Sequence, residues 1–405
     1  MDTERHPQRS ACLFVFAFSL ALYTLTLAPT VTLEYSGSMI TAAHHLGVPN
    51  PPGYPVWTLL AWLFQRVFGF MTYHGHPNPA WGVNFMSAFF GALSCGLVAW
   101  IVSRTSRDAG HRFAVSAFGG ISAGLLFAFS PFMWSQSVIA EMVTLNVFTI
   151  LLFLSLAYLG ISQRDRRFVY PLSFLLGIGF LNSPTFVLMI PVYLIACLQV
   201  GSWKQIPALL GLIVLGLLPM IYLPLAAAQN PPVNWGDART REGFLHLINR
   251  GQYERLTFSD VLSLQYAEQM LAYSKLLLLQ FTPPVLLLAS FSLFVLKRRT
   301  LWLLALLLCL FMYTFVLTAG LNPELDLQTL FIVRVNWIPS YAVMAILIGF
   351  GLTQLLSVVS NRGRSVFWLA CAAAVLLSLS PLAANFDPEF VKYFGGSGQG
   401  ISLDP

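Results

Sequence analysis

Long apolar runs separated by short polar or charged stretches dominate this sequence. Taking runs bounded by charges, proline and glycine, we predict eleven membrane spans, at residues 12–28, 81–103, 113–133, 142–161, 168–182, 184–201, 205–228, 276–296, 301–320, 336–358 and 365–384. A helix of about 20 apolar residues is long enough to cross a bilayer. The fifth and sixth runs are short and meet at Asn182-Ser183-Pro184, so the pattern leaves open whether they cross fully. The pattern predicts an all-α polytopic membrane protein.

Composition supports the same class of protein. The 405 residues are 57% hydrophobic and 9% charged, whereas soluble domains average about 25% charged residues. The five Cys fall in apolar runs without CxxC or CxxH spacing, which indicates buried side chains and no zinc or disulfide framework. The first run follows Arg5 and Arg9 as a signal peptide would. No small-x-small site follows it, so we predict an uncleaved first helix.

Charge predicts the orientation. With a cytoplasmic N-terminus, 14 of the 22 Lys and Arg residues and 4 of the 16 Asp and Glu residues lie inside, so the inside carries +10 and the outside −4. This distribution follows the positive-inside rule and indicates topology, so we predict no nucleic-acid partner. Counting residues 55–71 as a further span would reverse the later loops. We therefore predict an amphipathic interfacial helix there, with Gln65 and Arg66 on its wet side.

Two long loops lie on the outer side in this topology, at residues 29–80 and 229–275, and the C-terminus is also outside. We expect residues 1–385 to form the transmembrane domain and 386–405 a short outer tail without a soluble domain. The chain has no Asn-x-Ser/Thr sequon, which favours a bacterial protein of the inner membrane. No ionisable residue falls inside a predicted span, which argues against an ion-coupled transporter.

The outer loops hold the residue types that sugar transfer from a lipid phosphate requires. A carboxylate takes the acceptor proton, for which Glu34 and Asp237 are candidates. Cations hold the departing phosphate, and aromatic groups hold the sugar. For these roles the loops offer Arg239, Arg241, Arg250 and Arg255, and Tyr54, Trp57 and Trp235. Glu141 is a further candidate for substrate binding.

Each of these residues also has a structural interpretation. Glu34 is solvated at the end of a span, and Glu141 is an acid at a helix start. The arginines form the wet face of an interfacial helix, and the Trp residues belong to an aromatic belt. Adjacent His44 and His45 point apart on a helix, so they pack or cap rather than bind a metal ion.

One stretch resembles a known membrane family. TLAPTVTLEYSGSMITAAHHLGVPNPPGYPVWTLLAWLF, at residues 26–64, is similar to the opening of the domain of unknown function 2723 family, which includes the transmembrane protein 260 type O-mannosyltransferases. AEMVTLN (140–146), GIGFLNSPTFVLMIP (177–191), NWGDART (234–240), GQY (251–253) and NPELDLQ (322–328) follow in the expected order. The resemblance implies a GT-C glycosyltransferase fold, interfacial helices in the first outer loop and a polyprenyl-phosphate sugar donor. It implies an outer-face site. We expect Asn50, Tyr54, Asn234 and Trp235 to shape the sugar site, with Asn182 as a further substrate-binding residue and Arg250 as the phosphate candidate. We expect no cofactor and no metal.

The chain departs from the family pattern at polar positions in four motifs. Family members usually read Asp-Ser/Cys-Gly-Glu where this chain has Tyr35-Ser36-Gly37-Ser38. Asn50 replaces a His before Pro-Pro-Gly, Val143 stands at a Tyr position, and Leu181-Asn182-Ser183 replaces Thr-Asn-His. Both acids of the first motif are absent.

The sequence thus predicts a membrane glycosyltransferase that moves a sugar from a polyprenyl-phosphate donor to a protein or glycan hydroxyl on the extracytoplasmic face. The expected partners are the lipid-linked donor, the acceptor and membrane lipid. The missing acids favour an alternative, a catalytically inactive paralogue that binds the lipid-linked sugar or a partner enzyme. A passive transporter or flippase is a third hypothesis, disfavoured because the polar residues gather on one side.

Overall fold

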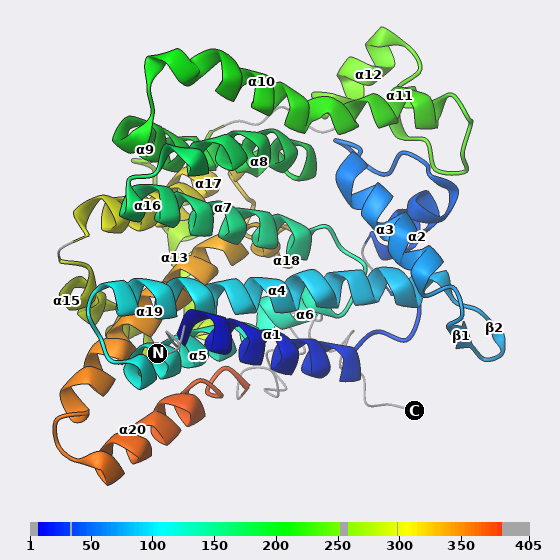
Figure 1. Ribbon diagram of the computed structural model, residues 1–405. Helices are drawn as coiled ribbons and strands as arrows, with labels where there is room; N and C mark the ends of the chain where they lie inside the picture. The colour runs from blue at the N-terminus through cyan, green and yellow to red at the C-terminus, as the bar shows by residue number, and fades with distance from the viewer. Residues whose placement is uncertain (1–6, 33–34, 252–257, 298, 383–405) are drawn as a thin grey trace, which may run out of the picture. The chain divides into compact units, whose positions relative to one another are not determined.

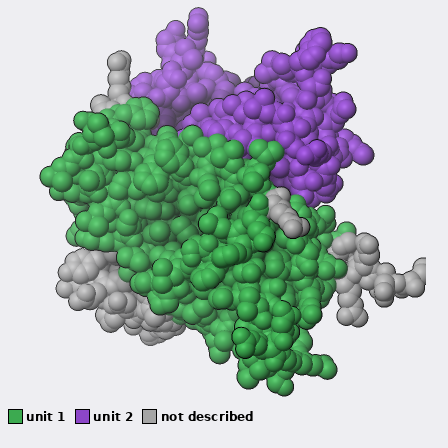
Figure 2. Space-filling model, turned by 90° about the vertical axis from the view of Figure 1, so that its left-hand side faces the viewer, with its two compact units in different colours: residues 1–22, 91–134, 258–397 green, residues 23–90, 135–257, 398–405 purple. Residues whose placement is uncertain are grey.

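The computed structural model describes residues 7–32, 35–251, 258–297 and 299–382, which are largely helical (Figure 1). The chain divides into two compact units (Figure 2). Unit 1 comprises residues 1–22, 91–134 and 258–397, and unit 2 comprises residues 23–90, 135–257 and 398–405. Three helices contribute residues to both units: α1 (Pro7–Leu25), α4 (Pro79–Asp108) and α6 (Pro131–Ser137).

Unit 2 holds the first long loop of the predicted outer side, 29–80, and the first part of the second, from residue 229 to residue 257. Its elements are α2 (Ser36–His45), α3 (Pro55–Val67), β1 (Thr72–Tyr73), β2 (His76–Pro77), α7 (Val143–Gln163), α8 (Val169–Asn182), α9 (Ile190–Val200), α10 (Ile206–Leu217), α11 (Tyr222–Ala227) and α12 (Arg241–Ile248). The two strands pair as an antiparallel hairpin. Helices α8 and α10 lie side by side (Figure 1) and cross at Gly177 and Gly216. A Cβ on either glycine would collide with the facing backbone, so both must lack a side chain.

Unit 1 is built around α19 (Ile338–Val359), which α5 (Phe113–Ala128) contacts closely through Gly119 and Gly349. Its other helices are α13 (Leu264–Gln280), α14 (Pro283–Leu287), α15 (Ser292–Leu296), α16 (Thr300–Phe311), α17 (Leu317–Leu321), α18 (Leu327–Val333) and α20 (Arg364–Leu377). A π-helical turn, η7 (Met312–Val316), joins α16 to α17, and a 3-10 turn, η8 (Arg334–Trp337), joins α18 to α19.

The helices confirm an all-α polytopic membrane protein. In the described ranges, six segments are long and apolar enough to cross a membrane: Pro7–Leu25, Pro79–Asp108, Val143–Gln163, Trp203–Ala227, Thr300–Leu321 and Leu327–Val359. Two bent helix pairs, beginning at Phe113 and Leu264, raise the number to eight. The predicted spans 168–182, 184–201 and 365–384 coincide with shorter helices. At 14 residues, α8 is about 21 Å long, less than the hydrocarbon core of about 30 Å. The count of eleven is therefore not confirmed.

Helix α3 occupies most of the stretch predicted as an interfacial helix, and it is not among the candidate spans in the described chain. Arg66 is exposed, as predicted, but beside it runs an exposed apolar stripe of Leu59, Leu63 and Val67, spaced four residues apart. The expected wet position of Gln65 is wrong, since Gln65 is 6% exposed and its amide donates to the carbonyl of Ile40 at 3.2 Å. Helix α2 packs on α3, so the polar side chain faces protein and the apolar stripe faces outward.

The close crossing of α8 and α10 makes a testable prediction. Gly216→Ala places a methyl group against the carbonyl of Phe174, so we expect it to destabilise the protein by about 1–3 kcal/mol. Gly211→Ala, on the same helix, is the matched control because no atom lies within 4 Å of its Cβ. Thermal unfolding in detergent measures both. Equal shifts in the two variants would contradict the packing of α8 on α10.

Candidate functional site

The two long loops are joined by backbone hydrogen bonds within unit 2. The N–H of Val48 donates to the carbonyl of Val233 at 2.9 Å, and the N–H of Trp235 donates to the carbonyl of Val48 at 3.0 Å. These bonds form a parallel bridge between Val48 and Asn234. The hydroxyl of Tyr222 adds a third bond, donating to the carbonyl of Gly47 at 2.8 Å. Segments nearly 190 residues apart in the sequence therefore form one surface.

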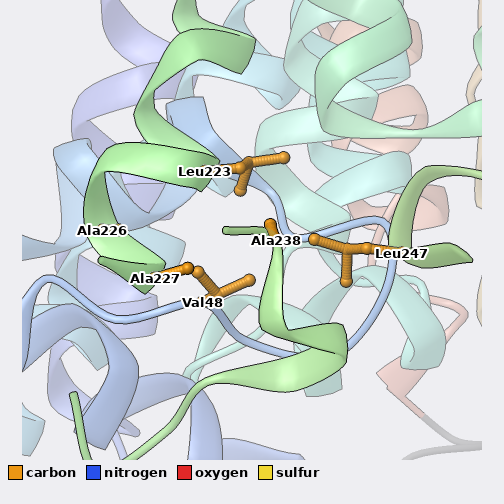
Figure 3. Close-up of a cluster of buried hydrophobic side chains, with 6 residues drawn as sticks. All are labelled: Val48, Leu223, Ala226, Ala227, Ala238 and Leu247. Atoms are coloured by element: carbon orange, nitrogen blue, oxygen red, sulfur yellow. The ribbon is translucent and has the colours of Figure 1, made fainter. Parts of the chain in front are cut away.

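An apolar cluster supports this junction (Figure 3). It contains Val48, Leu223, Ala226, Ala227, Ala238 and Leu247. Val48 and Leu247 are fully buried, so the cluster fixes both loops to the end of the α10–α11 segment. Gly53, in the Pro-Pro-Gly-Tyr-Pro turn, has φ of 95°, and a Cβ there would meet Leu223 at 2.7 Å. Only glycine fits this close approach, which explains the glycine in that turn.

Glu141 is a buried carboxylate in the segment between α6 and α7. The residue is 3% exposed. Its carbonyl accepts the indole N–H of Trp57 on α3 at 3.2 Å and the hydroxyl of Ser87 on α4 at 3.3 Å. Its own N–H donates to the Ser87 oxygen at 3.4 Å. Two helices therefore fix the backbone at Glu141, and the buried ring of Trp57, at 0% exposed, cannot stack on a sugar as predicted.

Three other predicted site residues are buried in unit 2. Asn50 is 5% exposed, and Tyr54, 7% exposed, has φ of 39°, a left-handed conformation that costs about 1 kcal/mol or more in a non-glycine residue. Asn182, at the end of α8, is 1% exposed. Neither amide atom of its side chain, nor Oδ1 of Asn50, has a hydrogen-bond partner among the described residues. Buried polar atoms normally have partners, so these positions call for water or a ligand.

Asp237 occupies a different environment. It ends the 3-10 turn η5 (Trp235–Asp237), and its carboxylate accepts two hydrogen bonds from Arg239, at 2.5 Å and 2.6 Å. These hydrogen bonds from Arg239 are the main cause that lowers the pKa of the Asp237 carboxyl. Both side chains remain almost half exposed. A carboxylate held this way is a weaker base than an unpaired one.

The remaining predicted site residues have long hydrogen bonds, are exposed, or lie outside the described residues. Asn234 donates to the carbonyl of Ala227 at 3.4 Å, and Trp235 is 44% exposed beside it. Arg250 is exposed and follows α12 with φ of 55°. Glu34 and Arg255 lie outside the described residues. In the part of the chain that the structure describes, no three His, Cys, Asp or Glu side chains gather as a metal site.

Sequence reasoning missed two features. Ser87 fixes the backbone of Glu141 but lies inside an apolar run, where no pattern distinguishes it. Arg334 is 1% exposed within the candidate span Leu327–Val359, because that span begins earlier than predicted. The sequence feature that could have identified it is its position, two residues before the predicted span 336–358.

The fold resembles that of solved membrane glycosyltransferases. The chain superposes on the crystal structure of ArnT from Cupriavidus metallidurans bound to undecaprenyl phosphate, with a TM-score of 0.56 over 96% of this chain and 75% of that chain, at 13% identity. Apo ArnT gives a TM-score of 0.55 at 14% identity, with the same coverage. At this identity the likeness concerns the fold alone, which is that of GT-C membrane glycosyltransferases.

Sequence comparisons support a TMEM260-like family. Residues 36–206 match the family model of the protein O-mannosyl-transferase TMEM260 N-terminal domain. The mouse protein O-mannosyl-transferase TMEM260 is 32% identical over 89% of this chain and 52% of its own length. The Dictyostelium discoideum protein O-mannosyl-transferase tmem260 is 25% identical over 63% of this chain and 34% of its own length. The chain is therefore TMEM260-like, as its motifs predicted, and it spans about half the length of the mouse relative.

The contacts of Glu141 make a second prediction. Trp57→Phe keeps an apolar ring but removes the indole N–H, so the segment around Glu141 should lose about 1 kcal/mol of local stability. Hydrogen exchange at the amide of Glu141 measures this loss as faster exchange. Trp62→Phe, also on α3, is the control and should leave that exchange rate unchanged. Unchanged protection in Trp57→Phe would refute the role of the indole.

Proposed function

We propose that this membrane protein transfers a sugar from a polyprenyl-phosphate donor to a hydroxyl of a protein or glycan on the extracytoplasmic face. The observation that carries the proposal is the junction of the two long loops, at Val48 and Asn234, in the unit that buries Glu141. Such a junction can hold an acceptor, a sugar and an acid–base group in fixed geometry. The GT-C fold supports the same class of reaction.

The carboxylate that the geometry favours as proton acceptor is Glu141. Its backbone is fixed by Trp57 and Ser87, and the residue is 3% exposed, so the carboxylate is held in a defined position away from bulk water. Asp237 is tied to Arg239, which makes it less basic and suits it better to orienting the loop. Glu34 remains the further carboxylate candidate from the first outer loop.

We assign the sugar and phosphate roles to polar groups of unit 2. The side-chain atoms of Asn50 and Asn182 that lack partners among the described residues are suited to hydroxyl groups of a sugar. Tyr54, Asn234 and the half-exposed Trp235 complete this proposed sugar site. Arg250 is the phosphate candidate. The mouse and Dictyostelium relatives are named O-mannosyl-transferases, and ArnT was crystallised with undecaprenyl phosphate, which supports a hexose on a lipid phosphate.

The proposed orientation places the N-terminus in the cytoplasm and the C-terminus outside. The charge distribution supports it, since the cytoplasmic segments carry +10 in that arrangement. The curated relatives come from mouse and Dictyostelium, so a bacterial inner-membrane origin stays a prediction from the absence of sequons.

The replaced family acids favour a second candidate function, an inactive paralogue that retains donor binding. Tyr35 is 41% exposed before the first turn of α2, and the hydroxyl of Ser38 donates to the carbonyl of Tyr35 at 3.0 Å. An aromatic residue and a small hydroxyl at these positions supply no carboxylate. The two functions differ in whether the chain turns over a donor or only binds it.

Glu141 variants test the transferase. Glu141→Gln keeps size and hydrogen bonding but removes the base, so we expect sugar transfer from a polyprenyl-phosphate mannose donor to fall at least about 100-fold. Asp237→Asn should cost less, because that carboxylate is already paired with Arg239. Radiolabelled transfer by purified protein measures both, and melting temperatures control for folding. Full activity in Glu141→Gln would contradict its assignment.

The double variant Tyr35→Asp with Ser38→Glu discriminates between the two candidates. It restores acids near the start of α2, at the exposed Tyr35 and the half-buried Ser38. If the natural chain is inactive, transfer should appear only in the double variant. If the natural chain already transfers sugar at a comparable rate, the inactive-paralogue hypothesis fails.

A further inference from the structure

Unit 1 buries one arginine in an apolar environment. Arg334 is 1% exposed and lies in η8, inside the candidate span Leu327–Val359. Arginine stays protonated under all ordinary conditions, so this position keeps a full positive charge. A charged residue within a membrane span is costly and marks a functional site by default.

Two aromatic rings hold the guanidinium group. Its Cζ lies 4.0 Å from the ring centroid of Phe331 and 5.0 Å from that of Phe132, each in cation–π geometry. Rings that pack on the flat surface of a guanidinium orient its edge, which carries the N–H donors. A planar fork of donors fixed in this way suits the oxygens of a phosphate or carboxylate.

A second polar group faces the same aromatic cluster. The ring of Tyr341, in the first turn of α19, packs on Phe132 with ring centroids 6.1 Å apart, and the guanidinium of Arg334 contacts the same Phe132 ring. Tyr341 is 1% exposed, and its hydroxyl has no hydrogen-bond partner in the described part of the chain. A buried hydroxyl without a partner calls for a water molecule or a ligand.

The neighbouring Tyr273 differs from Tyr341, because its hydroxyl does have hydrogen-bond partners. The rings of Tyr273 and Tyr341 are stacked at 5.9 Å. The hydroxyl of Tyr273 bonds to Ser340 at 3.0 Å and accepts the Thr314 hydroxyl at 3.2 Å, beside the π-helical turn η7. Unit 1 therefore satisfies one of two adjacent buried hydroxyls and leaves the one near Arg334 available.

We infer that Arg334 and Tyr341 form a buried anion site in unit 1 that takes a phosphate group. The guanidinium edge supplies charge-assisted donors and the tyrosine hydroxyl supplies a further donor. The anion site rests on the geometry of these residues, whereas the choice of phosphate rests on the proposed function, in which the donor carries one. The phosphate can belong to a lipid carrier or be free in solution, and the two sources differ in whether an apolar chain adds affinity.

Binding to the full chain in a maltoside detergent tests the inference, with farnesyl phosphate, farnesol and inorganic phosphate as probes. We expect saturable binding of farnesyl phosphate and none of farnesol, read by tryptophan fluorescence and by a rise in melting temperature. Arg334→Lys keeps the charge but loses the fork, and it should weaken binding about tenfold or more. Arg362→Lys, an exposed position in the same unit, should leave binding unchanged.

Tyrosine variants keep the test decisive if Arg334→Lys fails to fold. Tyr341→Phe should weaken farnesyl phosphate binding about threefold to tenfold, yet leave the melting temperature of the ligand-free protein unchanged or higher. Tyr273→Phe should do the opposite, lowering the melting temperature with binding intact, because its hydroxyl is part of a satisfied network. Wild-type affinity in Tyr341→Phe and Arg334→Lys, or equal binding of farnesol, would overturn the anion site.

The remaining outcomes identify the source of the phosphate and separate this inference from the transferase. Inorganic phosphate that binds as tightly as farnesyl phosphate supports a site for free phosphate, and tighter farnesyl phosphate supports a lipid carrier. If the protein transfers no sugar but farnesyl phosphate binding depends on Arg334, the proposed function fails and the anion site stands. If transfer depends on Glu141 while Arg334 and Tyr341 variants bind normally, only the anion site fails.

Discussion

Pairing of the backbone at Val48 with that at Val233 and Trp235 is the constraint on which the candidate site depends. Irregular segments at the end of membrane helices carry N–H and C=O groups that helix formation does not satisfy. Here two loops satisfy each other, with bonds of 2.9 Å and 3.0 Å, and a buried apolar cluster excludes water from the junction. The Pro-Pro-Gly-Tyr-Pro turn and the 3-10 turn at Asp237 are positioned by that pairing. Their left-handed residues, Tyr54 and Asp237, are tolerated because the surrounding bonds determine the backbone.

Two of the carboxylates in unit 2, Asp237 and Glu141, illustrate how environment separates chemically similar groups. Asp237 is almost half exposed and neutralised by Arg239, so its proton affinity falls. Glu141 is buried, and its position is fixed through its backbone by Trp57 and Ser87. Ion pairing suits a structural carboxylate, whereas a fixed and water-excluded carboxylate suits proton transfer. The same division of roles between a paired and a buried acid recurs in enzymes that use two carboxyl groups.

The sequence predicts the helices of this protein well and their faces poorly. Apolar run length locates the helices, and each of the eleven predicted spans coincides with helix in the described chain. The errors concern burial. Gln65 is buried and Leu63 exposed, opposite to the amphipathic prediction, because a helix at a membrane turns polar groups toward protein and apolar groups toward lipid. Trp57 could be located in the first loop, but its contact with Glu141 joins residues 84 positions apart, which no local pattern encodes.

Among the described residues, unit 2 buries the acidic Glu141 and unit 1 buries the basic Arg334. An apolar side chain of similar volume would remove the cost of desolvating a charge, which reaches several kcal/mol per ion. The aromatic rings around Arg334 recover only about 0.5–2 kcal/mol each. The backbone bonds of Trp57 and Ser87 would hold any residue at position 141, since they do not involve its side chain. The proposed transfer reaction would use the carboxylate of Glu141, and the inferred anion site would use the guanidinium of Arg334.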